Sequence, residues 1–287
     1  MNYFSEEDLL DCYSSILERT EADIELILVS NSLLQDSFIK DLASLGKPIK
    51  TIQNEDNLGF AKACNIGAKH ATGDFLFFLN PDTVFLNDSI HHLIKCFEES
   101  ENPGILGAKT YTPDKKPIAS AKNHLSVFYF FSLLLPFLKA MSNKSYGHFL
   151  PDNSMEVPVV NGHALFIKSD LYKSIDGMDE NLFMYWEEND LCLRIQKLDF
   201  SVIYCHSAEI IHKSGTSTRK HFSKMEIEKH RSQKKFILKH YPYWDGLNRI
   251  TGILAYFWRS VYSLLLFKKS KFKQFWSLFN WYTFSYK

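Results

Sequence analysis

The sequence predicts an α/β fold in which a mixed sheet is flanked by helices and is followed by a helical, amphipathic extension. Three observations predict this fold. Short apolar runs typical of buried strands alternate with stretches of helical periodicity. Polar residues follow directly after several of these runs, where a strand leaves its sheet. Residues 245–287 then change to an apolar stretch followed by interleaved basic and aromatic residues.

The first helix is predicted over residues 6–18, with Ser5 before it as a candidate N-cap. Its apolar residues recur along one face, at Leu9, Leu10, Tyr13, Ile16 and Leu17. Residues 24–30 form the next apolar run, and we predict a strand there that leads into Ser30-Asn31-Ser32.

Residues 57–83 are the most informative stretch of the chain. Gly59 permits a backbone turn that other residues resist. Residues 60–70 then have the Ala-rich composition of a helix, and residues 75–79 are an apolar run typical of a strand buried on both faces. Asn80-Pro81-Asp82 ends that run and places a carboxylate where the strand leaves the sheet.

The position of Asp82 suggests a ligand site, because open α/β sheets bind ligands at the carboxyl ends of their strands. A carboxylate beside Asn80 and Thr83 suits Mg²⁺ or Mn²⁺ together with a diphosphate. The alternative is a plain turn in which Asn80 and Asp82 only cap the backbone.

A second block lies far along the chain. Residues 157–168 are an apolar strand pair interrupted by Asn161-Gly162. Residues 190–198 are predicted to be a helix, since Leu191, Ile195 and Leu198 recur at helical spacing.

Acidic residues crowd the start of this second predicted helix. Glu187, Glu188 and Asp190 lie where the helix dipole favours negative charge, so capping alone is an alternative to a functional role, above all for Asp190. The glutamates differ, because Tyr185 and Trp186 beside them would partly desolvate a carboxylate. Such surroundings raise the pKa of a carboxyl group and suit a general base.

His212 follows a predicted strand end at Ile210-Ile211, as Asp82 follows its own strand. A histidine at this place could bind a metal or a diphosphate. The alternative is an ordinary surface or core residue, which is the more common role of an isolated histidine.

These blocks together resemble family 2 glycosyltransferases, and within them the rhamnosyltransferase-like branch. The matching motifs begin with Asn57-x-Gly59-Phe-Ala-x-Ala-x-Asn65, Gly73-Asp74 and Leu79-Asn-Pro-Asp-Thr83. They continue with Gly177-Met-Asp-Glu180, Glu187-Glu-x-Asp-Leu191 and His212-x-x-Gly215-x-Ser217. The resemblance implies a GT-A-type, Rossmann-like sheet, with Asn80 in place of the first Asp of the Asp-x-Asp metal motif.

The resemblance also implies roles for single residues. Asp82 and His212 would hold the metal, Mg²⁺ or Mn²⁺, and Glu188 would be the catalytic base, with Glu187 as the second candidate. The residues expected to bind the nucleotide-sugar are Tyr3, Ser30, Asn31, Asn57, Gly59, Asn65, Asn80 and Asp82. Those expected on the acceptor side are Asn161, Gly162, Trp186 and Asp190. The backbone of residues 214–217 would lie near phosphate.

Two positions depart from the family pattern. Relatives begin with an apolar strand ending in Thr-Tyr-Asn or Asn-Tyr-Asn, whereas this chain opens Met1-Asn-Tyr-Phe-Ser5, so we expect a truncated first strand. Ser30 stands where relatives carry an Asp that contacts the nucleotide. These departures motivate an alternative to an active enzyme, namely a catalytically impaired relative that serves as a binding or scaffold subunit in glycan assembly.

The composition of the chain indicates which binding partners and which cellular compartment to expect. The formal net charge is zero and the pI is about 7.2, so no global field favours nucleic acid. The five cysteines form no C-x-x-C pair, which fits a reducing cytosol rather than a disulfide framework or a zinc site. The N-terminus shows no charged leader before an apolar core, and we therefore expect no signal peptide.

The C-terminal residues 245–287 are predicted to lie on a membrane without crossing it. Residues 250–267 are apolar but contain Arg259, which is costly in a spanning helix. Lysines and aromatic residues alternate after Lys268, as in helices that lie at a lipid surface. The alternative is an ordinary core-packing helix. A second apolar segment, residues 125–138, is expected to border a lipid-linked acceptor.

The sequence thus predicts a GT-A domain over residues 1–244, with a nucleotide-sugar half (1–110) and an acceptor half (111–244), and a membrane-associating extension over 245–287. The expected function is an inverting glycosyltransferase at the cytoplasmic face of the cell membrane. Its donor would be dTDP-rhamnose-like or a UDP-sugar, and its acceptor a glycan or lipid-linked acceptor in bacterial surface polysaccharide synthesis. A sugar nucleotidylyltransferase is a weaker third option, because the Gly-rich N-terminal loop of those enzymes is absent.

Overall fold

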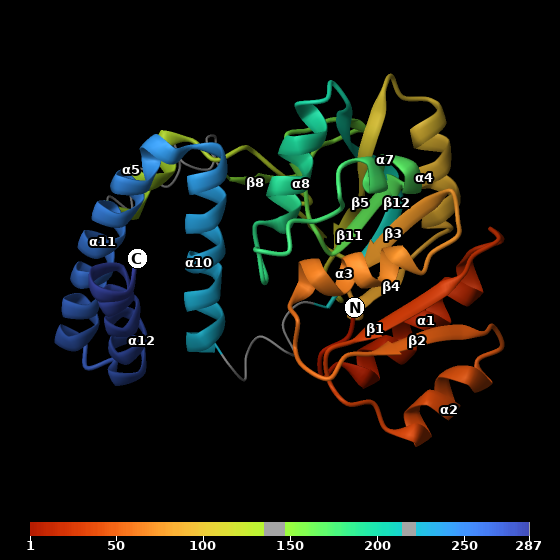
Figure 1. Ribbon diagram of the computed structural model, residues 1–287, viewed down its shortest axis with the longest axis horizontal. Helices are drawn as coiled ribbons and strands as arrows, with labels where there is room; N and C mark the ends of the chain where they lie inside the picture. Colours follow the sequence, from red (N-terminus) through yellow and green to blue (C-terminus); the bar gives the residue numbers. More distant parts are fainter. Residues whose placement is uncertain (135–146, 214–221, 287) are drawn as a thin grey trace. The chain divides into compact units, whose positions relative to one another are not determined.

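The computed structural model describes residues 1–134, 147–213 and 222–286 (Figure 1). The chain divides into two compact units. Unit 1 comprises residues 1–122 and 148–217, and unit 2 comprises residues 123–147 and 218–287. Each unit is described by itself.

Unit 1 is built on a seven-stranded mixed sheet, which confirms the predicted α/β class. Its central order is β3-β11-β5-β12-β4, with β6 added beside β5 and β9 beside β12. Only β12 and β5 run parallel, and every other pair in this sheet is antiparallel. The strands are β3 (Phe75–Leu79), β4 (Thr83–Phe85), β5 (Pro103–Tyr111), β6 (Pro117–Ile118), β9 (Met155–Glu156), β11 (Ala164–Lys168) and β12 (Ser201–His212).

Two smaller sheets complete the strands of unit 1. β1 (Leu26–Ser30) and β2 (Ile49–Gln53) form a parallel pair, and Asn2 adds a single parallel bridge to Ser30. The other sheet has the order β10-β7-β8. Its strands are β7 (Ala121–Lys122), β8 (His148–Phe149) and β10 (Val159–Val160).

The helices of unit 1 are α1 (Glu6–Arg19), α2 (Asp36–Ser44), α3 (Phe60–Lys69), α4 (Ser89–Glu98), α7 (Ser169–Ser174) and α8 (Glu187–Gln196). Three of them, α1, α3 and α8, lie close to positions predicted from the sequence. The predictions for residues 6–18 and 60–70 are confirmed, as is the strand at 75–79. The helix predicted over 190–198 instead begins at Glu187, and Leu198 is 50% exposed because the helix ends before it.

Ser5 precedes α1 as predicted, but its side chain makes no cap hydrogen bond. Its hydroxyl donates instead to the Tyr3 carbonyl at 3.2 Å, and its backbone N–H donates to the Asn2 side chain at 3.1 Å. The N-cap prediction is therefore right about the position and wrong about the hydrogen bond.

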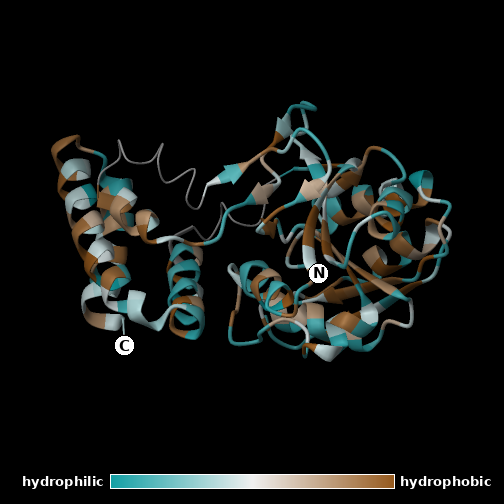
Figure 2. Ribbon diagram, turned by 90° about the horizontal axis from the view of Figure 1, so that it is seen from above, coloured by the Kyte–Doolittle hydropathy of each residue, from teal (hydrophilic) through white to brown (hydrophobic). Residues whose placement is uncertain are grey.

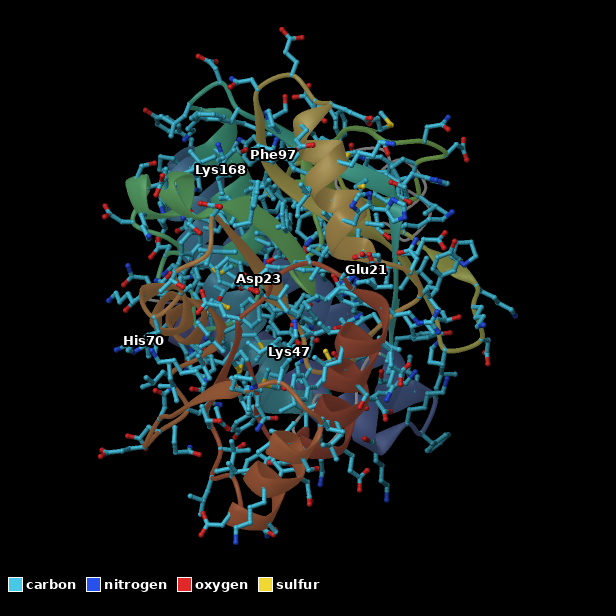
Figure 3. All side chains as sticks on the ribbon, turned by 90° about the vertical axis from the view of Figure 1, so that its right-hand side faces the viewer. Glu21, Asp23, Lys47, His70, Phe97 and Lys168 are labelled. Carbon is cyan, nitrogen blue, oxygen red and sulfur yellow. The ribbon has the colours of Figure 1, made fainter. Side chains whose placement is uncertain are left out.

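The core of unit 1 lies on both faces of the large sheet. Along β11, Leu165 and Ile167 join one apolar cluster, whereas Ala164 and Phe166 join the other, as the alternation of a strand requires. The hydropathy colouring shows these inner strands as largely hydrophobic, with hydrophilic segments around them (Figure 2). At the rim, the Lys168 ammonium lies 5.7 Å from the centre of the Phe97 ring (Figure 3).

Unit 2 is helical. Its elements are α5 (Val127–Leu134), α10 (Phe222–His240), the short 3₁₀ helix η2 (Pro242–Trp244), α11 (Asp245–Leu265), α12 (Lys269–Asn280) and the π-helical turn η3 (Trp281–Ser285). Its apolar core gathers Tyr256, Leu278, Trp281, Tyr282 and Tyr286. Within the described residues, no helix has both the length and the apolar character needed to span a membrane.

Unit 2 includes residues before the predicted extension over 245–287. α10, which the sequence assigned to the acceptor half, packs against α11 and α12, and α5 packs against α11. The apolar segment predicted over 125–138 is described only up to Leu134, where α5 ends, and its remainder lies outside the described residues.

Candidate active site

Two strand ends bring Asp82 and His212 together. β3 ends at Leu79, a turn carries Asp82, and β4 then pairs with β12 so that Thr83 lies opposite His212. The Asp82 Oδ1 and His212 Nε2 atoms are 3.2 Å apart, and the two side chains are only 14% and 17% exposed. Residues from distant parts of the chain thus meet at one edge of the sheet, as predicted.

Asn80 and His163 extend this cluster. The Asn80 amide nitrogen lies 3.5 Å from His212 Nε2, and the backbone N–H of Asn80 donates to the His163 carbonyl at 3.0 Å. The His163 ring stacks on the His212 ring, with centroids 4.3 Å apart and planes 13° from parallel. Burial holds the pKa of His163 well below its usual value, so this ring is neutral and supports His212 without adding charge.

The segment Asn161-Gly162-His163 joins this cluster to the predicted base. His163 contacts His212 on one side, and Gly162 lies against Glu188 on the other. A Cβ atom at position 162 would lie 3.4 Å from the Glu188 Cβ and 3.7 Å from its carboxyl carbon. Asn161 is fixed by hydrogen bonds to the backbone at 119 and 120. The two predicted acceptor-side residues of this segment therefore position the backbone beside Glu188.

Glu188 is paired with a lysine that sequence reasoning missed. The Lys122 ammonium donates to Glu188 Oε1 and, at 3.3 Å, to the side-chain oxygen of Asn189. The side chains of Lys122 and Glu188 are only 7% and 12% exposed. Among the residues that the structure describes, none hydrogen-bonds the buried Glu188 Oε2. One carboxylate oxygen is therefore held in place, and the other has no protein partner.

Glu187 differs from its neighbour. Its side chain is buried, and burial, followed by the charge of Glu188, raises its pKa well above the usual value. The neutral form of Glu187 is therefore favoured, whereas Glu188 forms an ion pair with Lys122. This arrangement fits Glu188 better than Glu187 as a proton acceptor.

The turn before α8 holds an uncommon backbone. Tyr185 and Trp186 have φ angles of 67° and 73°, in the left-handed region that bulky residues rarely adopt. Such backbone persists only when the surroundings fix it, and it is frequent at functional sites. Trp186, predicted on the acceptor side, is itself only 4% exposed and directly precedes Glu187.

Asp190 has a structural environment. Its carboxylate is completely buried and accepts from Arg194 Nε at 2.7 Å. Arg194 in turn donates to the carbonyls of Ile175 and Gly177 at 2.8 and 2.6 Å. The pair ties α8 to the preceding loop, so the structural alternative considered for Asp190 agrees with its surroundings.

On the predicted nucleotide side, Asn31, Asn57 and Gly59 form one network. The Asn31 amide donates to Asn57 Oδ1 and to the Gly59 carbonyl, both at 3.1 Å. Gly59 has φ 84°, and a Cβ there would lie 2.3 Å from the Phe183 carbonyl oxygen. Gly59 is therefore needed both for its left-handed backbone and for its close approach to Phe183, shortly before the glutamates.

Asn65 is fully engaged by the protein. Its Oδ1 accepts from the Tyr172 hydroxyl at 2.5 Å and the Met178 N–H at 2.9 Å. Its Nδ2 donates to the Met178 carbonyl at 2.8 Å and to Glu180 at 3.1 Å. An amide side chain has two acceptor and two donor positions, so this network leaves none for a nucleotide. The geometry gives Asn65 a structural role.

The residues at the start of the chain are arranged around Ser30, which is completely buried. Its hydroxyl donates to the Ser32 carbonyl at 2.7 Å and accepts from the Asn2 amide at 3.0 Å. Tyr3 follows Asn2, and its ring packs edge-on against Phe4 with centroids 4.7 Å apart. Ser30 thus holds the backbone beside Tyr3 and Asn31 and exposes no side-chain oxygen.

The chemistry of Asp82 and His212 fits a divalent cation. Asp82 would supply a carboxylate oxygen, the kind of ligand that Mg²⁺ and Mn²⁺ prefer, and His212 an imidazole nitrogen, which leaves the other positions to phosphate oxygens and water. Across 1–134, 147–213 and 222–286, no group of three or more His, Cys, Asp or Glu is suited to hold a metal. The predicted phosphate contacts at Gly215 and Ser217 lie outside the described residues.

Comparison with known proteins adds a family to this geometry. The family model described as glycosyl transferase family 2 matches residues 1–153. The low-salt glycan biosynthesis hexosyltransferase Agl10 of Haloferax volcanii is 24% identical over 216 residues, which cover 74% of this chain and 65% of the relative. An N-acetylglucosaminyl-diphospho-decaprenol L-rhamnosyltransferase of Mycobacterium tuberculosis is 26% identical over 199 residues, covering 63% of this chain and 62% of the relative. The chain thus spans somewhat less than two thirds of these two relatives.

Among solved structures, the mannosyltransferase PcManGT of Pyrobaculum calidifontis, in complex with GDP-Man and Mn²⁺, superposes with a TM-score of 0.59. It is 12% identical, and the match covers 100% of this chain and 86% of that structure. At this identity the likeness concerns the fold, which is the GT-A fold predicted from the sequence.

Proposed function

Because this chain belongs to glycosyl transferase family 2, we propose that it is an inverting glycosyltransferase that moves a sugar from a nucleotide-sugar donor to a glycan or lipid-linked acceptor. One observation carries the proposal. The consecutive residues Asn161-Gly162-His163 contact Glu188 at one end and His212, beside Asp82, at the other. A candidate proton acceptor and a candidate cation site therefore lie on opposite sides of one short segment.

In the proposed reaction, Glu188 with Lys122 and Asp82 with His212 have separate roles. Glu188 would accept the proton of the acceptor hydroxyl at its Oε2, which has no protein partner, while Lys122 holds Oε1. Asp82 and His212 would hold Mg²⁺ or Mn²⁺, which supplies positive charge beside the diphosphate of the donor when it is bound. Attack from the face opposite the diphosphate inverts the anomeric carbon.

The relatives suggest donors to test. One is named a rhamnosyltransferase, one a hexosyltransferase, and the solved neighbour binds GDP-Man. We propose a dTDP-rhamnose-like donor or a UDP-sugar, and we place the product in bacterial surface polysaccharide synthesis.

A donor screen tests this proposal. The purified chain is incubated with dTDP-, UDP- and GDP-sugars and Mn²⁺ or Mg²⁺, and release of the nucleoside diphosphate is measured with and without EDTA. We expect metal-dependent release from one donor class. Thermal shifts with the same donors reveal binding without turnover. Binding without release would favour the catalytically impaired scaffold relative. The absence of both binding and release would contradict the glycosyltransferase and the scaffold alike.

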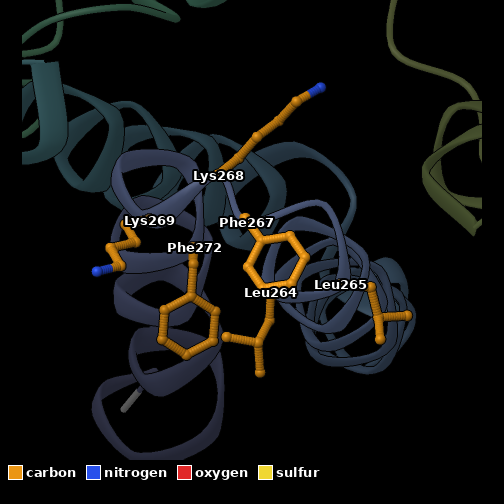
Figure 4. A pocket seen from close by; sticks show the side chains of 6 residues that line it. All are labelled: Leu264, Leu265, Phe267, Lys268, Lys269 and Phe272. Atoms are coloured by element: carbon orange, nitrogen blue, oxygen red, sulfur yellow. The ribbon is translucent and has the colours of Figure 1, made fainter.

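We further propose that unit 2 attaches the protein to the cytoplasmic face of a membrane. The α11–α12 turn surface, which comprises Leu264, Leu265, Phe267, Lys268, Lys269 and Phe272, lines a cavity of about 330 Å³ (Figure 4). Phe267 is 90% exposed and Leu265 70%. The apolar side chains gather at the turn, and the ammonium groups of Lys268 and Lys269 point away from them (Figure 4).

This combination is typical of an interfacial anchor. Exposed apolar patches of this kind are uncommon on monomeric soluble proteins unless they bind something. Further lysines follow at 271 and 273, both exposed, so apolar contact with acyl chains and attraction to anionic head groups would act at one place. The other face of α11 and α12 packs inside unit 2. The alternative of an ordinary core-packing helix therefore applies to that face and not to the exposed one.

Vesicle sedimentation tests the membrane proposal. We expect the protein to bind phosphatidylglycerol vesicles at low salt, to bind less at high salt because the lysine contribution is screened, and to bind neutral vesicles weakly. Equal binding to neutral and anionic vesicles would contradict the role of the lysines. Protein that stays in the supernatant with both would contradict membrane attachment.

A further inference from the structure

Polar side chains of α1 contact the strand that follows Asp82. α1 packs against β4, an edge strand of the large sheet that pairs with β12 among the described strands (Figure 1). The Phe85 N–H of β4 donates to the Ser15 hydroxyl at 3.0 Å, and the Cys12 thiol lies 3.4 Å from the Thr83 hydroxyl. Both Ser15 and Cys12 are buried. α1 therefore supplies hydrogen-bond partners along the edge of β4 that the sheet leaves open.

The same face of α1 binds Lys213, the residue that follows His212. Positions 8, 11, 12 and 15 are three or four residues apart, so their side chains share one face of the helix. The Lys213 ammonium donates to Asp8 Oδ1 at 3.2 Å and to Asp11 Oδ2 at 2.5 Å. The side chains of Asp8 and Lys213 are 14% and 28% exposed, and that of Asp11 is 63% exposed. The contact with Asp8 is thus the better shielded of the two.

Lys213 also holds Asp82 through its backbone. Its N–H donates to the Asp82 carbonyl at 2.9 Å, next to the point where His212 pairs with Thr83. The side chain of Lys213 therefore binds α1, while its backbone binds one candidate metal ligand and directly follows the other. Because the Asp82 and His212 side chains are only 3.2 Å apart, a displacement of Lys213 would move the backbone of both.

We propose that Lys213 is a positioning residue for the cation site of Asp82 and His212, and that Asp8 and Asp11 hold it in place. The inference rests on the proposed function, which assigns Mg²⁺ or Mn²⁺ to that site. Two carboxylates compensate the charge of the ammonium at α1, which lowers its repulsion of a divalent cation at Asp82. Replacing residues that orient metal ligands commonly weakens metal binding about 10- to 100-fold.

Two other roles for Lys213 give different expectations. If Lys213 acted only through its charge, it would repel the cation, so Lys213→Met would strengthen Mn²⁺ binding and loss of the Asp8 and Asp11 carboxylates would weaken it. If Lys213 bound the donor diphosphate directly, the two aspartates would not be needed. Positioning predicts instead that removing either side of the ion pair weakens Mn²⁺ binding.

Binding of Mn²⁺ to the full chain, followed by the EPR signal of free Mn²⁺, tests the proposal without a donor. We expect Lys213→Met, and the double variant Asp8→Asn with Asp11→Asn, each to weaken binding about 10-fold. The triple variant should bind no more weakly than Lys213→Met, because all three residues act through one contact. Lys213→Arg keeps the ion pair and should restore most of the affinity. The control Lys95→Met, which breaks the exposed Lys95–Glu99 pair, should bind as the wild type does.

Amide exchange in the same variants reports on the backbone itself. In Lys213→Met, exchange at residues 82–85 and 210–213 should be at least about 5-fold faster, and exchange in β2 should be unchanged. Wild-type affinity and wild-type exchange in this variant would overturn the proposal and leave the cation site intact.

The other outcomes are equally distinct. Tighter Mn²⁺ binding by Lys213→Met would show a charge effect. Unchanged binding by the double aspartate variant, with weaker binding by Lys213→Met, would show a direct ligand role for the lysine. Either result would overturn the positioning role. A wild type that binds no Mn²⁺ would contradict the cation site of the proposed function, and the positioning role with it.

Discussion

Buried ionisable side chains in the two units differ in whether all of their polar atoms have hydrogen-bond partners. In unit 1, Glu187 and Glu188 each keep one buried carboxylate oxygen without a protein partner. In unit 2, His230 is equally buried, yet both ring nitrogens are engaged: Nε2 by the Tyr256 hydroxyl at 2.8 Å, and Nδ1 by the Tyr282 hydroxyl at 2.9 Å. Glu187 and Glu188 therefore keep unused hydrogen-bonding capacity, whereas both ring nitrogens of His230 are occupied.

The surfaces of the two units differ in how many large apolar side chains they expose. Most of the large apolar side chains that are exposed in the described residues belong to unit 2, with Trp258, Tyr262 and Phe267 at 64%, 64% and 90%. The unpartnered carboxylate oxygens of Glu187 and Glu188 suit a reacting substrate, and the exposed apolar side chains of unit 2 suit a lipid or protein partner. Unit 1 thus has unpartnered polar atoms at its candidate site, and unit 2 has exposed apolar side chains at its surface. These two features indicate different kinds of ligand.

The largest effect is expected at Glu188. Glu188→Gln keeps the size of the side chain but cannot accept a proton, so turnover should fall about 10²- to 10⁴-fold with donor affinity little changed. Nucleoside diphosphate release measures turnover, and thermal shift measures affinity. Glu187→Gln is the matched control, because that carboxyl already favours its neutral form. A larger loss in the control would exchange the roles of the two glutamates.

Unit 2 should be most sensitive at His230. His230→Phe leaves the buried hydroxyls of Tyr256 and Tyr282 without this partner, and we expect a loss of about 2–4 kcal/mol in the free energy of unfolding of unit 2. Urea unfolding followed by tryptophan fluorescence reports this, since Trp244, Trp258, Trp276 and Trp281 all belong to unit 2.

Exposed His91 in unit 1 supplies the control for that measurement. His91→Phe should change stability by no more than about 0.5 kcal/mol. A His230 variant as stable as the wild type would show that the tyrosine–histidine network contributes little to unit 2.

The lysines of the α11–α12 turn surface should have a smaller effect. Replacing Lys268 and Lys269 by Gln should weaken binding to anionic vesicles by about 1 kcal/mol for each charge, or about 30-fold together. Lys115→Gln with Lys116→Gln, an exposed pair in unit 1, is the matched control. Equal losses in the two double variants would indicate a response to net charge rather than to this surface.

The pH dependence of stability should have opposite signs in the two units. Burial lowers the pKa of His230 to about 3 from 6.5, so the unfolded chain binds the extra proton and the stability of unit 2 is lost as pH falls from 6.5 toward 3. Burial raises the pKa of Glu187, so its contribution is present below pH 4.5 and is lost as pH rises above that value. Each slope reaches about 1.4 kcal/mol per pH unit at most.

Single variants isolate the two slopes. Glu187→Gln should stabilise unit 1 at pH 8 relative to pH 4, and His230→Phe should flatten the acid limb of unit 2. Amide exchange resolved by segment separates the units. The same sign of pH dependence in both would contradict the assigned protonation states.

The sequence predicted the parts of the fold that depend on local patterns. Phe75–Leu79 is a strand with the predicted ends, because its apolar run is bounded by polar residues on both sides. Asp82 and His212 could be placed together because both follow strands that end at the same edge. The family resemblance, more than periodicity, selected Glu188.

Long-range pairings could not be predicted in the same way. Lys122 lies in a two-residue strand with no periodicity, and its partner is 66 residues away. Asn65 looked like a ligand-binding residue, but its partners Met178 and Glu180 are more than 110 residues away in the chain. Side-chain hydrogen bonds of this range depend on how the chain packs, which no local pattern records.

The proposed sugar-transfer site joins residues from distant parts of unit 1 around Asp82. The most direct measurement compares Mn²⁺-dependent release of nucleoside diphosphate by the wild type, by Asp82→Ala and by the exposed control Asp114→Ala. We expect Asp82→Ala to lose at least about 100-fold in rate while its Tm stays close to that of the wild type, and Asp114→Ala to remain fully active. An Asp82→Ala variant that releases nucleotide at the wild-type rate would contradict the account.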